Sequence, residues 1–81
     1  MVQPESNKGF KLVLETALLA APAPLTVSEL RRLFEDDPGS DEVRRVLGEL
    51  VEDWQGRGVE LVQTAGGWRF QTRIEYQVYL D

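Results

Sequence analysis

Apolar residues recur with the period of a helix near the start of the chain. From about Lys8 to Ala21, one face of such a helix collects six apolar side chains, namely Phe10, Val13, Leu14, Ala17, Leu18 and Ala21. Leu12 and Leu19 fall on the opposite side, among polar residues. We expect the first face to pack on the core. Leu12 and Leu19 are either covered by another element of this chain or exposed for a partner.

A proline-rich linker and a capping signal define a second helix. The segment APAPL (residues 21–25) ends the first helix, because proline cannot continue it. Thr26 and Glu29 have the spacing of a capping box, in which each side chain accepts a hydrogen bond from the backbone N–H of the other residue. The second helix is predicted to run to about Phe34 and to bury Val27, Leu30, Leu33 and Phe34.

The third helix has the most regular apolar pattern. After an acidic turn, Ser40 is the predicted N-cap, and Asp41 and Glu42 suit the positive first turn of a helix. One stripe then contains Val43, Val46, Leu47, Leu50, Val51 and Trp54. The segment QGRG ends this helix, with Gly56 or Gly58 free to adopt a positive φ.

The remaining third of the chain predicts a hairpin and a last helix. Two alternating segments, Val59–Thr64 and Trp68–Thr72, read as strands, and the residues between them, 65–67, supply a glycine-containing turn. A short helix is predicted from about Arg73 to Leu80. Alternation along the strands places Val59 with Leu61 on one face, and Trp68 with Phe70 on one face.

This order of elements predicts a mainly α fold with a β-hairpin. The pattern is that of a winged helix-turn-helix: three helices, a two-stranded wing and a short C-terminal helix. Residues 1–8 are predicted to be a flexible N-terminal tail and residues 9–81 the winged-helix domain. The 81 residues suit one domain with a thin core, so association with a partner would add stability.

The composition restricts the chemistry of the chain. It contains no cysteine and no histidine, which excludes disulfides, thiolate metal sites, cysteine nucleophiles and imidazole bases. Residues 35–37 are acidic but lack the spacing of a calcium loop, and Gly66-Gly67 lies between strands rather than opening a helix. We therefore expect no enzyme, no catalytic residue, no cofactor and no metal. No signal peptide or membrane-spanning segment is recognisable.

The charge pattern argues against strong binding of nucleic acid. The net charge is −5, and the outward face of the third helix combines Arg44 and Arg45 with Glu49, Glu52 and Asp53. In a DNA-binding winged helix this face would enter the major groove, where carboxylates meet phosphate repulsion. Arg44, Arg45 and Arg69 of the wing are the candidates for weak DNA contacts. A DNA-binding transcriptional regulator fragment stays an alternative function.

The last helix is more apolar than a short surface helix requires, with Ile74, Tyr76, Val78, Tyr79 and Leu80. Part of it is expected to cover the core. The rest, with Leu12 and Leu19, forms a candidate dimer or partner surface made of Leu12, Leu19, Ile74, Tyr76 and Tyr79. In the alternative interpretation, Tyr76 and Tyr79 close one end of the core. A generic protein-interaction winged helix is a third possible function.

An ordered set of short motifs resembles the N-terminal winged-helix domain of the ScpB family, segregation and condensation protein B. The motifs are Pro24-Leu25-Thr26, Arg57-Gly58, Gly66-Gly67-Trp68-Arg69, Gln71-Thr72-Arg73 and Glu75-Tyr76 followed by Leu80. The resemblance covers roughly residues 10–80.

The resemblance implies a non-catalytic scaffold role in bacterial chromosome condensation and segregation. Proteins of this family bind the kleisin ScpA as a dimer, within a condensin-like complex whose SMC subunits supply the ATPase. The N-terminal domain is associated with self-dimerisation, and much of the kleisin contact lies on a second winged-helix domain. The expected partners are therefore a second copy, ScpA and through it SMC, with DNA bound weakly at most. The implied location is the cytoplasm, at the nucleoid.

Overall fold

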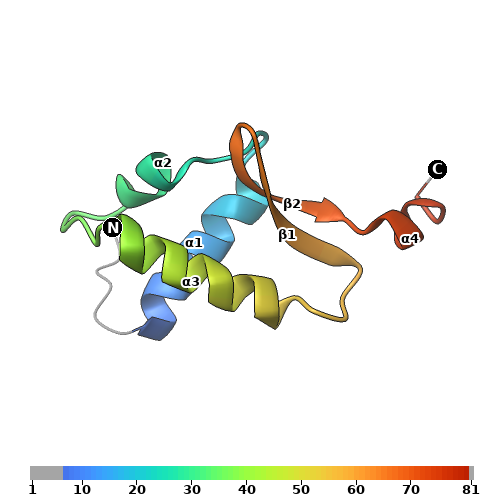
Figure 1. Cartoon of the computed structure of the whole chain (residues 1–81), viewed down its shortest axis with the longest axis horizontal. Helices are drawn as coiled ribbons and strands as arrows, with labels where there is room; N and C mark the ends of the chain where they lie inside the picture. The colour runs from blue at the N-terminus through green and yellow to red at the C-terminus, as the bar shows by residue number, and fades with distance from the viewer. Residues whose placement is uncertain (1–6, 81) are drawn as a thin grey trace.

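The computed structural model describes residues 7–80, which form four helices and one antiparallel hairpin (Figure 1). The elements are α1 (Asn7–Ala20), α2 (Val27–Arg31), α3 (Ser40–Asp53), β1 (Val59–Thr64), β2 (Gly67–Thr72) and α4 (Ile74–Gln77). The predicted winged helix-turn-helix is confirmed. Of the predicted tail, residues 1–6 lie outside the described residues, and Asn7 and Lys8 belong to α1.

The core lies where α1, α2 and α3 meet and the wing closes over them. Its buried members are Phe10, Leu14, Leu18, Leu30, Phe34, Val43, Val46, Leu47, Leu50 and Leu61. The rings of Phe10 and Phe34 lie 4.8 Å apart between centroids and join α1 to the segment that follows α2. Three helices thus share one apolar cluster, because the predicted stripes of all three face inward.

The second helix starts as predicted and ends earlier. Thr26 Oγ1 accepts from the N–H of Glu29 at 3.1 Å, and Glu29 Oε1 accepts from the N–H of Thr26 at 2.9 Å, which completes the capping box. The predicted end at Phe34 is wrong, because α2 ends at Arg31. The backbone then tightens into bonds three residues apart, such as Phe34 N–H to Arg31 O at 3.3 Å, and these keep Phe34 buried in the core.

The third helix begins without the predicted serine cap. Gly39, with φ of 86°, is the N-cap, and no side chain caps the helix. Ser40 lies inside the helix, where its hydroxyl accepts a hydrogen bond from Arg31 Nη1 at 3.1 Å. Asp37 Oδ1 accepts from the N–H of Gly39 at 2.8 Å and fixes the turn. The prediction of Ser40 as cap is therefore wrong, because Asp37 and a left-handed glycine shape this turn instead.

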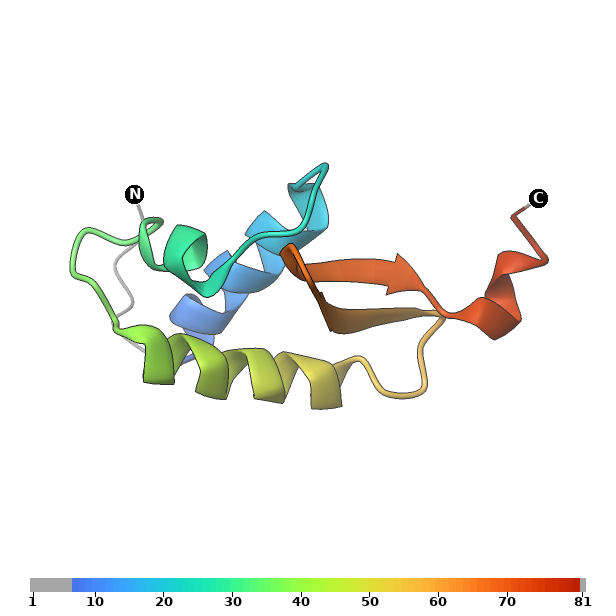
Figure 2. The same ribbon diagram turned by 45° about the horizontal axis from the view of Figure 1, so that its top comes forward.

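The wing is attached to the linker between α1 and α2. β1 and β2 pair from Val59 with Thr72 to Thr64 with Gly67, so β2 begins one residue earlier than predicted. A short bridge joins Leu25 of the linker to Trp68, with N···O distances of 2.9 Å and 2.7 Å. The turn end of the hairpin therefore lies against the linker, and its open end points away from the helices (Figures 1 and 2).

The last helix differs most from its prediction. α4 has four residues, and the chain continues as a turn to Leu80. None of its residues is buried, so the expectation that part of this segment covers the core is wrong. The alternative that Tyr76 and Tyr79 close the core is also wrong, because their side chains are 45% and 79% exposed. The open end of the hairpin carries α4 beyond the reach of the core (Figures 1 and 2).

Candidate partner-binding surface

An apolar groove lies between α1 and the segment that follows α2. It is lined by Leu12, Val13, Thr16 and Ala17 of α1 and by Leu33, and it has a volume of about 400 Å³. We call it the α1 groove. The Leu12 side chain is 59% exposed at this groove. Of the two interpretations of Leu12, cover by another element of this chain is wrong, and exposure is confirmed.

Leu19 lies apart from the α1 groove. Its side chain is 51% exposed, so it too lacks the cover of another element. It lines a smaller hollow of about 130 Å³, formed with the proline linker (residues 21–24) and with Arg69 and Phe70 of β2. The structure therefore leaves both leucines exposed but does not bring them into one pocket.

Residues 74–80, which we call the C-terminal arm, form a second apolar surface. Ile74, Val78, Tyr79 and Leu80 are each more than two-thirds exposed. The rings of Tyr76 and Tyr79 lie 6.2 Å apart and form the aromatic part of the arm. The arm, the α1 groove and the hollow beside Leu19 are separate features, so the predicted partner surface is divided between three places on the molecule.

Arg73 fixes the base of the arm. Its backbone N–H donates to Gly58 O at 2.8 Å, and its guanidinium donates to Arg57 O at 2.8 Å and to Trp54 O at 3.3 Å. It also pairs with Glu60 Oε1 at 3.1 Å. The sequence pattern does not predict this role of Arg73, because its acceptors lie 13 to 19 residues away along the chain. The arm therefore leaves the domain in a defined direction.

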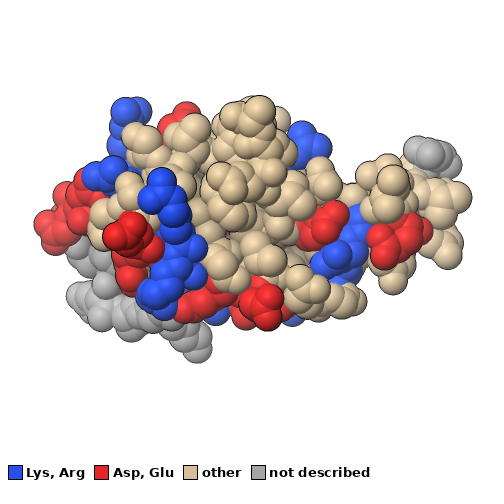
Figure 3. Space-filling model, in the orientation of Figure 1, with Lys and Arg blue, Asp and Glu red and all other residues tan. Residues whose placement is uncertain are grey.

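The outer face of α3 is a network of opposite charges. Arg45 pairs with Glu42, Nη2 to Oε2 at 2.5 Å, and also with Glu49. The hydrogen bond from Arg45 holds the pKa of the Glu42 carboxyl below its ordinary value and raises the pKa of Arg45. Figure 3 shows acidic and basic side chains close together over α3, and mainly uncharged atoms over the turn end of the wing. A phosphate would have to displace carboxylates that already hold this guanidinium.

Two further cations near this face, Lys11 and Arg44, also lie beside carboxylates. Lys11 of α1 contacts Asp53 at 2.7 Å and Glu49 at 3.3 Å, and the hydrogen bond to Asp53 raises the pKa of Lys11. Arg44 lies 3.9 Å from Asp41. Arg69 is on β2, where its guanidinium donates to Gln71 Oε1 at 3.3 Å. The three predicted DNA contacts thus come from two elements, α3 and β2.

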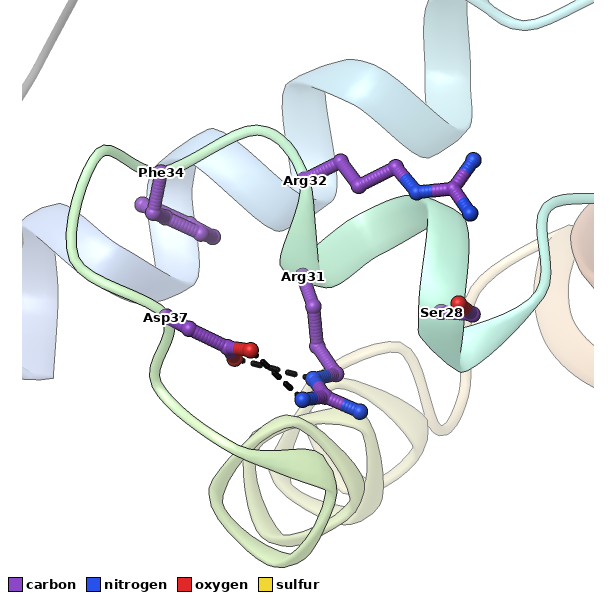
Figure 4. Close-up of a pocket in the computed structure, with 5 residues that line it drawn as sticks. All are labelled: Ser28, Arg31, Arg32, Phe34 and Asp37. Atoms are coloured by element: carbon purple, nitrogen blue, oxygen red, sulfur yellow. Dashed lines mark hydrogen bonds and ion pairs between the residues drawn. The ribbon is translucent and has the colours of Figure 1, made fainter.

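A polar hollow of about 320 Å³ beside α2 is closed by an internal ion pair. Arg31 donates to both carboxylate oxygens of Asp37, at 2.8 Å and 2.5 Å, while Arg32 points away from this pair (Figure 4). The bonds from Arg31, with that from the N–H of Gly39, lower the pKa of Asp37 to about 2. The arrangement holds a loop in place, and both charged groups are already paired.

The described residues add two negative findings. Between residues 7 and 80, no group of three His, Cys, Asp or Glu side chains is placed to hold a metal ion. No helix in that range has the length and apolar character required to cross a bilayer.

Comparison with known proteins identifies relatives along nearly the whole chain. Residues 12–81 match the family model of the segregation and condensation complex subunit ScpB. The chain is 44% identical over 73 residues to a segregation and condensation protein B homolog of Coxiella burnetii, covering 88% of this chain and 35% of that protein. It is 35% identical over 69 residues to the protein B of Syntrophotalea carbinolica, covering 83% and 34%. The chain thus spans about a third of the length of these relatives.

Solved structures agree with this assignment. ScpB from Mycobacterium tuberculosis superposes with a TM-score of 0.83 at 28% identity, over 93% of this chain and 47% of that one. A dimer of a ScpB N-terminal domain complexed with a ScpA peptide superposes with a TM-score of 0.79 at 30% identity, over 90% of this chain and 91% of that chain. The chain therefore belongs to the ScpB family of segregation and condensation complex subunits.

Proposed function

We propose that this chain is a non-catalytic scaffold domain that forms a homodimer and binds the kleisin ScpA. It would act in the cytoplasm at the nucleoid, in an SMC–kleisin complex for chromosome condensation and segregation. The observation that carries this proposal is the likeness to the ScpB N-terminal domain dimer with its ScpA peptide, which covers about nine-tenths of both chains. In that relative, the N-terminal domain forms a dimer in complex with a ScpA peptide.

The distribution of apolar surface supports a scaffold role. The α1 groove and the C-terminal arm expose large apolar side chains, which are the groups that stabilise protein interfaces when water is removed from them. The Tyr residues of the arm belong to a residue type that is enriched at such interfaces. Arg31 is paired with Asp37 beside α2, and Arg45 is paired with Glu42 on α3, so these charged groups have a structural role.

Dimerisation and kleisin binding are tested together. We expect sedimentation of the purified chain to show a concentration-dependent dimer, because the thin core leaves apolar surface to be covered by a partner. We also expect a ScpA peptide to retain the chain in a pull-down, with an unrelated peptide of equal charge as the control. Only monomer at high concentration would contradict the proposed dimer, and no retention by the ScpA peptide would contradict the proposed kleisin binding.

DNA binding is expected to be weak. The net charge is −5 and Arg45 is held by two carboxylates, so few counterions would be released from the phosphates. Fluorescence anisotropy with duplex DNA at physiological salt should give no submicromolar affinity, and changing Arg44, Arg45 and Arg69 together to alanine should have little effect. Submicromolar affinity that disappears in this triple variant would favour the transcriptional regulator instead.

A further inference from the structure

The C-terminal arm is held in an orientation that leaves none of its residues buried against its own domain. Four bonds from Arg73 and one from Gln77 Nε2 to Thr72 O at 3.2 Å fix the base of the arm to the open end of the hairpin. The arm then extends outward with Ile74 80% exposed. A segment with fixed direction and unburied side chains is pre-organised for a surface outside its own fold.

The α1 groove is the concave apolar surface that suits such a segment. Its volume of about 400 Å³ lies within the range of about 300–1,000 Å³ typical of ligand clefts. Its walls are almost entirely apolar, and the arm offers aromatic and aliphatic side chains. Arg32, which is exposed and precedes Leu33 of the groove in the chain, carries the charge opposite to that of Glu75 in the arm.

The arm and the groove of one chain cannot meet. The domain measures 42 Å along its longest axis, and both ribbon views place α4 at the opposite end from the first half of α1 (Figures 1 and 2). A second copy brings its arm to the groove without unfolding either domain. A two-fold axis would form this contact twice, once in each direction.

We propose that two copies of this chain exchange arms, so that residues 74–80 of each copy dock in the α1 groove of the other. This inference rests on the proposed dimerisation and specifies its surface. The relative that matches nine-tenths of this chain is a dimer of the N-terminal domain complexed with a ScpA peptide, and most of that domain lies within the matched residues. The arm and the groove are the large exposed apolar features of those residues.

Cross-linking of the whole chain tests the exchange, since the natural chain has no cysteine to interfere. One preparation carries Leu12→Cys in the groove and the other carries Tyr79→Cys in the arm. After mixing with a short bis-maleimide, we expect several-fold more covalent dimer than from either variant alone. Gln63→Cys, at an exposed position of β1, replaces Tyr79→Cys as the matched control and should give only background.

A second measurement compares the dimer dissociation constants of variants with a carboxylate in the groove or in the arm. Leu12→Asp and Tyr79→Asp should each raise the dissociation constant of the dimer by about tenfold or more, because a carboxylate would be buried without a partner. Both positions are exposed in the single chain, so the melting temperature of the monomer should not change, and Gln63→Asp serves as the control.

The possible outcomes separate this inference from the proposed function. Sedimentation could show a dimer in which L12C cross-links only to L12C, or Y79C only to Y79C. That result would overturn the exchange of arms and leave dimerisation in place. Protection of L12C from maleimide by a ScpA peptide, but not by dimerisation, would assign the groove to the kleisin and also overturn it. A chain that stays monomeric would instead contradict the proposed dimerisation itself.

Discussion

Replacing Gly67 with alanine is expected to lower the free energy of unfolding by at least about 3 kcal/mol. Gly67 has a φ of 132°, a conformation that residues with a side chain rarely adopt. A Cβ atom there would lie 2.5 Å from Leu25 O, 2.6 Å from Leu25 C and 2.9 Å from Thr26 N. These are backbone atoms, so no side-chain rotation relieves the clash. Urea denaturation followed by circular dichroism measures the loss.

The position next to Gly67 provides the matched control. A Cβ on Gly66 would meet side-chain atoms of Pro24 at 3.8 Å, which is ordinary van der Waals contact, and Gly66 is not among the glycines with positive φ. We expect Gly66→Ala to change the free energy of unfolding by less than about 1 kcal/mol. Equal stability of the two variants would mean that the bridge between Leu25 and the wing is not formed in solution.

The close contact at Gly67 explains why the wing keeps its position. The bridge between Leu25 and Trp68 brings the backbone of the linker against β2, and only a residue without a side chain allows that distance at the start of the strand. The Gly-Gly pair predicted a turn between strands. The contact with the linker could not be predicted, because it joins residues about 40 positions apart.

Those parts of the fold that depend on local pattern could be predicted from the sequence. The stripe containing Leu47 and Leu50 identified the buried face of α3, and the Thr26–Glu29 spacing identified the start of α2. Both signals act within two turns of one helix. The start of α3 was harder to predict, because both Ser40 and Asp37 are residue types that bond to the backbone at the start of a helix. Asp37 takes this role here, and its ion pair with Arg31 holds it in place.

The same distinction applies to the candidate surface. The helical pattern placed Leu12 on the polar side of α1, where it could be either exposed or covered by another element. Only the packing of the whole chain shows that it is exposed. The exposure of Tyr79 depends on the direction in which the hairpin leaves the domain. That direction is set by Arg73, whose acceptors Arg57 and Trp54 precede β1. Local periodicity contains no information about such contacts.

Replacing Trp54 with alanine is expected to lower the free energy of unfolding by about 3 kcal/mol, the lower end of the range for buried aromatic residues. Trp54 follows the last residue of α3 and is only partly buried. Its ring lies 4.8 Å from that of Phe70, between centroids, and the guanidinium carbon of Arg57 lies 4.9 Å from the ring centroid. Its Nε1 donates to Glu15 Oε2 at 2.8 Å.

Trp54 therefore joins three elements, and two further variants separate its contributions. Trp54→Phe keeps the contact with Phe70 and removes the hydrogen bond to Glu15, so it should cost about 1 kcal/mol. Tyr79→Ala removes an exposed aromatic side chain and should leave the unfolding of the monomer unchanged. Thermal and urea unfolding at low protein concentration compare the three. If Trp54→Ala cost no more than Tyr79→Ala, Trp54 would not link α1, α3 and β2, and the wing would depend on the Leu25 bridge and its core contacts alone.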